Sequence, residues 1–180
     1  MSWMDTLGGL VAQFGGGQGN QNAEKGFEEI AHMLPSGALA DGLSAAFRSD
    51  QTAPFPEMAG QLFGNSGSGQ KASMLNSLLA TAGPLLLAKL TSGGGLSSLT
   101  SVLGGAISGQ GSTPQVTEEQ ASQVSPEDVQ DLAKHAEKHD PSIVDRLSEI
   151  YAQHPTLIKT LGGAAIAIAL SKIHDSQLNR

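Results

Sequence analysis

Short stripes of apolar residues, spaced three and four positions apart, recur along the whole chain and end at proline or glycine. Two clear examples are the sets Leu39, Leu43, Ala46, Phe47 and Val129, Leu132, Ala133, Ala136. This spacing places apolar side chains along one side of an α-helix, where other helices can bury them. Proline ends such segments because it lacks the amide donor, and glycine ends them because it keeps too much backbone entropy. The sequence therefore predicts an all-α protein, a bundle of short helices.

Glycine- and serine-rich stretches divide this helical chain into parts. An amphipathic arm with a glycine-rich linker is expected at residues 1–20, and an N-terminal helical part follows at 21–92. A flexible link is expected at 93–116, and a C-terminal helical part at 117–180. A chain of 180 residues can bury one sizeable core or two small ones, so it needs no disulfide or metal staple.

Charged residues are distributed unevenly. Between Met58 and Thr117 the only charged residues are Lys71 and Lys89, whereas the C-terminal part carries many charges of both signs. The net charge of -7 opposes the attraction to phosphate on which nucleic-acid binding depends. We therefore expect no nucleic-acid partner.

Cysteine is absent from the sequence. This excludes disulfides, thiolate metal sites and cysteine nucleophiles, and it is compatible with a reducing compartment. The residues after Met1 lack a basic region followed by a compact apolar stretch, so we expect no secretory signal and a cytoplasmic location.

The first fourteen residues, "MSWMDTLGGLVAQF", have an apolar stripe at helical spacing. Trp3, Leu7, Leu10 and Phe14 share one side of the predicted helix. The following "GGGQGNQN" cannot hold a helix. The sequence predicts a tethered amphipathic arm, and these four residues are candidates for contact with a partner.

The segment "TLIKTLGGAAIAIAL" is apolar on nearly all sides and predicts one continuous last helix. It contains two positions without a side chain, Gly162 and Gly163, and Ile166 lies three residues after them. Small residues let another helix backbone approach closely. Gly162, Gly163 and Ile166 are therefore candidates for the centre of the bundle or for a contact between copies.

The middle segment "QKASMLNSLLATAGPLLLAKL" predicts a core helix that Pro84 kinks or interrupts. It contains Asn76, Thr81 and Lys89 and lacks about 20 uninterrupted apolar residues, so we expect no membrane span. A further short helix is expected at "LSSLTSVLGGAI", although serine, threonine and glycine are weak helix formers.

His135 and His139 lie four residues apart in "HAEKH", on one side of a helix, where two imidazoles can bind one metal ion. Zinc proteases place the glutamate directly after the first histidine, whereas Glu137 comes two residues later. Both histidines also lie in the last turn before Pro141, where cations offset the negative end of the helix dipole. The structural interpretation explains more, and we expect neither a metal nor another cofactor.

Catalytic motifs are not recognisable in this sequence. None of the glycine runs ends in the lysine and hydroxyl residue of a phosphate-binding loop, and "GNSGSG" lacks the preceding strand of a hydrolase elbow. We therefore expect no catalytic residue and no enzyme.

Two stretches of the chain resemble each other. "FEEIAHMLPSGALADGLSAAF" and "VQDLAKHAEKHDPSIVDRLSEIY" both contain an amphipathic helix, a proline–serine junction and the pattern Asp-x-Leu-Ser-x-x-aromatic. Two explanations are open: a degenerate internal duplication, or the chance recurrence of two short helices separated by a proline.

Short helices are expected in the segments "LPSGALADGLSAAFRSDQTAPFPEMAGQLFG", "GQKASMLNSLLATAGP" and "VSPEDVQDLAKHAEKHDPSIVDRLSEIYAQHP". In the succession of these helices and in the residues that start and end them, this part of the chain resembles the YidB-like proteins. That bacterial family carries the domain of unknown function DUF937. The resemblance implies a small all-helical bacterial protein without an assigned reaction. It does not identify any functional residue in this sequence.

These observations favour a non-catalytic structural or interaction protein. Its expected partner is a protein or a second copy of the chain. The alternative is a peripheral membrane protein whose arm lies in the lipid interface, although Asp5 and the lack of lysine and arginine in the arm give no attraction to anionic lipid. A metal-binding protein or enzyme ranks last.

Overall fold

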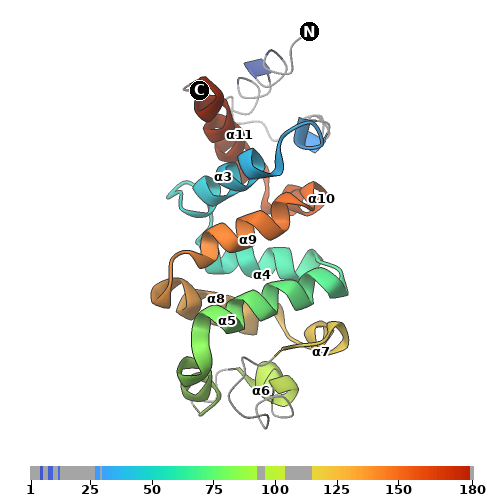
Figure 1. Ribbon diagram of the computed structural model, residues 1–180, viewed down its shortest axis with the longest axis vertical. Coiled ribbons are helices and arrows are strands. Elements are labelled where there is room, and N and C mark those ends of the chain that lie inside the picture. Colours follow the sequence, from blue (N-terminus) through green and yellow to red (C-terminus); the bar gives the residue numbers. More distant parts are fainter. Residues whose placement is uncertain are drawn as a thin grey trace. The chain divides into compact units, whose positions relative to one another are not determined.

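The computed structural model describes residues 5, 8, 9, 12, 27, 28, 30–92, 96–103 and 115–178, without the side chains of 84–92, 177 and 178. Within these ranges the chain forms α-helices and one 3-10 turn and contains no strand (Figure 1). The predicted all-α fold class is therefore confirmed for the described residues. The elements are α3 (Ser36–Phe47), α4 (Phe55–Asn65), α5 (Ser68–Ser92), α6 (Ser97–Leu103), α7 (Glu118–Ser122), α8 (Pro126–His139), α9 (Ile143–Ala152), α10 (Pro155–Ile158), η1 (Lys159–Leu161) and α11 (Gly163–Leu178).

The chain divides into two compact units that do not follow the sequence order. Unit 1 combines Met1–Pro54 with Ser148–Arg180, and unit 2 is the intervening Phe55–Leu147. The parts expected at 21–92 and 117–180 thus each contribute to both units. Helix α9 carries the chain from unit 2 back into unit 1.

Unit 1 is built on the contact between α3 and α11, which lie against each other in Figure 1. Gly42 marks the closest approach, because a Cβ atom at this position would lie 2.7 Å from the carbonyl oxygen of Ala169 and 2.9 Å from Cγ1 of Ile173. The buried residues of α11 have small side chains between larger ones: Ala165, Ile166, Ala169, Leu170 and Ile173.

Unit 2 packs α8 against α4 and against α5, and α7 against α5. Its core consists mainly of leucine, alanine and valine. The fully buried large side chains here include Met58, Leu62, Phe63, Met74, Leu75 and Leu78. Lys71 lies over the ring of Phe63, 5.3 Å from its centroid, so its ammonium group covers the edge of this core.

Helix α5 is kinked where the sequence predicts a kink. Gly83, directly before Pro84, has φ 70° and ψ 161°, a backbone conformation outside the helical region. Proline disfavours the helical conformation of the residue before it, and glycine alone adopts this positive φ without strain. The kink predicted from Pro84 is confirmed.

The predicted continuous last helix is wrong. Gly162 has φ 87° and ψ 166°, which separates the short α10 and η1 from α11. This conformation is open to glycine and costly for other residues, so the glycine pair that suggested close packing also supplies the break. α11 then continues to Leu178, beyond the predicted end.

The expected flexible link at 93–116 contains ordered structure at its described positions. Helix α6 lies within it, with Leu96, Leu99 and Leu103 buried, and Val116 is buried as well. The weak helix predicted at "LSSLTSVLGGAI" is confirmed for Ser97–Leu103. The packing of its leucines against the rest of unit 2 compensates for the poor helix propensity of its serines and threonine.

The helix caps of the C-terminal part follow local sequence signals. Ser125 caps α8, its Oγ accepting a hydrogen bond from the backbone N–H of Asp128 at 3.2 Å, and Pro126 occupies the first helical position. Thr117 and Gln120 form a reciprocal capping box at the start of α7, which the sequence interpretation missed.

Candidate functional site

The N-terminal arm is described at Asp5, Gly8, Gly9 and Ala12, and all four are helical. Asp5, Gly9 and Ala12 are exposed. At 100° per residue these three positions lie on the side of the helix opposite the predicted apolar stripe. The stripe residues Trp3, Leu7, Leu10 and Phe14 lie outside the described residues.

The small-residue candidates lie at the start of α11. Gly162 provides the break described above, Gly163 is the first residue of α11, and Ile166 is buried with 0% exposure. The close approach of α11 to α3 in unit 1 lies at Gly42, opposite Ala169 and Ile173, whereas a Cβ atom added at Gly162 would have no atom within 4 Å. The side chain of Ile166 belongs to that contact-forming face and offers no exposed surface.

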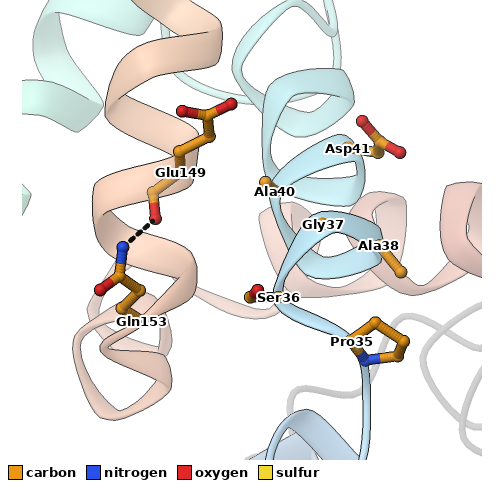
Figure 2. A pocket seen from close by; sticks show the side chains of 8 residues that line it. All are labelled: Pro35, Ser36, Gly37, Ala38, Ala40, Asp41, Glu149 and Gln153. Carbon is orange, nitrogen blue, oxygen red and sulfur yellow. Dashed lines mark hydrogen bonds between the residues drawn. The ribbon is translucent and has the colours of Figure 1, made fainter.

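A hollow of about 450 Å³ lies in unit 1 between the first turns of α3 and the last turn of α9 (Figure 2). Its lining residues are Pro35, Ser36, Gly37, Ala38, Ala40, Asp41, Glu149 and Gln153. Ser36 and Ala40 lie on the side of α3 that faces Glu149 and Gln153, whereas Asp41 lies on the other side of α3 (Figure 2). The sequence interpretation did not single out any of these residues as a candidate for binding or catalysis.

The charged groups of this hollow are the carboxylates of Asp41 and Glu149. Helix α3 begins after Pro35 without a side-chain cap, and Gln153 Nε2 donates to the carbonyl oxygen of Glu149 at 3.5 Å. The two carboxylates lie on different sides of α3 and do not converge on one point. The arrangement can accommodate a polar group, but it does not provide the paired acid and base that catalysis requires.

Glu28 and Lys159 form an ion pair within unit 1, joining the helical residues before α3 to η1. The hydrogen bond from Lys159 Nζ lowers the pKa of Glu28, burial opposes this shift, and the positive charges of Lys159 and His32 add to the lowering. Nothing in the local sequence pattern links these two residues, which are 131 positions apart.

His135 and His139 lie on α8 of unit 2. The His135 Nδ1 is 2.7 Å from the carbonyl oxygen of Asp131, one turn earlier in the same helix, and His139 is the last residue of α8. Among the described residues, no group of three or more histidine, aspartate or glutamate side chains is placed to hold a metal ion. The described helices also include none with the length and apolar character needed to cross a membrane.

Comparison with family models, with curated proteins and with solved structures finds no match to this chain. The resemblance to YidB-like proteins therefore stays a prediction from the sequence. Arguments about function rest on the residues and geometry of this chain.

Proposed function

We propose that the protein is a non-catalytic interaction protein that self-associates through the apolar stripe of its N-terminal arm. The observation that carries this proposal is the segregation of the arm's residues. The sequence predicts an apolar stripe along one side of the arm, and the described positions Asp5, Gly9 and Ala12 on the opposite side are exposed. An amphipathic helix with such a stripe is stabilised by burying it against another helix face.

The described side chains of the two units offer little other apolar surface for a contact. Met33, with 62% exposure, is the exposed large apolar side chain among the described residues, and the others are buried or half-buried. Isolated apolar side chains of this kind are ordinary on protein surfaces. The arm is therefore the better candidate for an apolar contact between copies.

The test is the molar mass in solution, measured by size-exclusion chromatography with light scattering over a range of concentrations. We expect the full chain to form a concentration-dependent oligomer and a chain starting at Gln21 to be monomeric. Leu10→Asp, in the stripe, should weaken the oligomer. Ala12→Asp adds the same charge on the opposite side and should leave it unchanged. A monomeric full chain would disprove self-association.

The alternative proposal is that the stripe binds a lipid surface, with Trp3 at the level of the headgroups. Flotation with phosphatidylcholine vesicles separates the two proposals. If Leu10→Asp abolishes flotation of a full chain that is monomeric, the stripe binds lipid and the self-association proposal is wrong.

A further inference from the structure

Helix α6 is held on the rest of unit 2 by a polar contact to α8. The carboxylate of Asp128, in the first turn of α8, accepts hydrogen bonds from the backbone N–H of Ser98 at 3.0 Å and of Leu99 at 3.2 Å, and from the hydroxyl of Ser98. The Ser98 Oγ in turn accepts a hydrogen bond from the backbone N–H of Ser125 at 3.1 Å. A residue of α8 thus caps α6, and a residue of α6 bonds the N-cap residue of α8.

The carboxylate of Asp128 lies at the N-terminal ends of two helices. It is 8% exposed, and both helix ends present backbone N–H groups with partial positive charge. A buried carboxylate is stable when hydrogen bonds satisfy its oxygens, so this placement is favourable only while α6 is docked.

Helix α6 has little stability of its own. It has 7 residues, "SSLTSVL", and an isolated helix of this length does not persist in water. The hydroxyls of Thr100 and Ser101 bond the carbonyl oxygens of Leu96 and Ser97 one turn earlier, which does not improve the helix. Its order depends on the burial of its leucines and on the Asp128 contact.

The sequence on both sides of α6 is rich in glycine, with "GGG" before it and "GGAISGQGS" after it. Helix α6 contacts α5 and α8 only lightly compared with the contact between α4 and α8. From the capping geometry and this light contact, we infer that α6 is a strap that opens as a whole from the rest of unit 2, and that Asp128 is its latch. This inference does not depend on self-association.

Opening of the strap breaks the Asp128 contact and brings the buried side chains of Leu96, Leu99 and Leu103 into water, while α4, α5 and α8 stay packed. Regions that open locally are those with few buried contacts, and their amides exchange before those of the core. Opening of α6 alone therefore accelerates exchange of the α6 amides only, whereas global unfolding exposes the amides of all helices together.

Hydrogen–deuterium exchange followed by mass spectrometry on the full chain tests the inference. In the wild type, peptides covering 97–103 should exchange at least about tenfold faster than those covering the buried turns of α8, as expected for a locally opening element. Asp128→Ala should accelerate exchange at 97–103 by about tenfold or more, because it removes hydrogen bonds to a charged acceptor. Exchange in α3 and α11 should not change.

Glu127→Ala is the matched control. Glu127 is an exposed acid in the same first turn of α8, so its loss removes the same charge near the helix end. Exchange at 97–103 should remain at the wild-type rate in this variant. Ser98→Ala removes the hydroxyl from the strap side and should accelerate exchange at 97–103 even if Asp128→Ala does not fold.

Two results would overturn the inference. In the first, α6 exchanges no faster than α8 in the wild type, which makes the two helices one cooperative element. In the second, Asp128→Ala or Ser98→Ala accelerates exchange in α6 and α8 equally, or changes neither, so that Asp128 does not act as the latch of a separate strap.

Discussion

The side chain of Asn76 pairs with the backbone of Val116, 40 residues further along the chain. Its Oδ1 accepts a hydrogen bond from the Val116 N–H at 2.7 Å, and its Nδ2 donates to the Val116 carbonyl oxygen at 3.3 Å. One side-chain amide thus satisfies both polar groups of a buried residue that belongs to no helix. The pair fixes the segment before α7 against α5 within unit 2.

Asn76→Ala should lower the free energy of unfolding by about 1–3 kcal/mol, because it leaves two backbone groups of Val116 without their partner. Urea unfolding followed by circular dichroism measures this change. Ser73→Ala on the exposed side of α5 is the control, since Ser73 Oγ bonds only the carbonyl oxygen of Gly69 in its own helix. Equal stability of the two variants would show that the Asn76 pair contributes nothing.

Gly42→Ala should destabilise unit 1 by about 1–3 kcal/mol, because the added methyl group meets the backbone of α11 and forces α3 and α11 apart. Gly37→Ala lies on the same helix in open space, with no atom within 4 Å of the added Cβ, and should leave stability unchanged or raise it by up to about 1 kcal/mol. Thermal unfolding of both variants tests this difference. If Gly42→Ala is as stable as Gly37→Ala, the close approach of the helices is not required.

Gly83→Ala should cost about 1–3 kcal/mol, because its positive φ at ψ 161° is strained for a residue with a side chain. The comparison is Gly64→Ala near the end of α4, where the added Cβ would make ordinary contact with Pro126 at 3.6 Å and the backbone is not left-handed. Chemical unfolding should show a lower midpoint for Gly83→Ala and little change for Gly64→Ala. A wild-type midpoint for Gly83→Ala would mean that α5 can straighten without loss.

The elements that the sequence predicts are those encoded by neighbouring residues. Ser125 and Pro126 start α8, and Pro84 locates the kink in α5, because a cap or a proline acts within one helical turn. Gly162 shows the limit of this approach. A glycine pair allows both close packing and a break in the helix, and only the tertiary environment decides between them.

Contacts between distant residues had no signal in the sequence pattern. Asp128 is one of the two acids in the first turn of α8, yet its carboxylate caps α6 from 30 positions away. The contact between α3 and α11 joins the N-terminal and C-terminal segments of unit 1, and it too cannot be predicted from the spacing of apolar residues. Periodicity shows which face of a helix is buried but not which helix buries it.

The Glu28–Lys159 ion pair predicts how stability depends on pH. A carboxyl group whose pKa is lower in the folded state than in the unfolded chain binds fewer protons when folded. Its stabilising contribution is therefore present above the unfolded pKa, for which the ordinary value is 4.5, and is lost as the pH falls through the lowered folded pKa. Asp140 acts in the same direction, because the side-chain and backbone hydrogen bonds from Ser142 lower its pKa from 3.8.

Glu28→Gln should consequently be less stable than the wild type at pH 7, and this difference should shrink as the pH is lowered below about 4.5, the usual range for glutamate. Urea midpoints between pH 7 and pH 3 measure the change. Glu57→Gln removes another exposed carboxylate, in α4 of unit 2, and leaves the Lys159 pair intact, so it should keep the acid sensitivity that this pair provides. A Glu28→Gln profile parallel to that of the wild type over the whole range would show that the ion pair does not contribute to acid sensitivity. Because both partners are partly exposed, at 26% for Lys159 and 35% for Glu28, added salt should weaken the effect at pH 7.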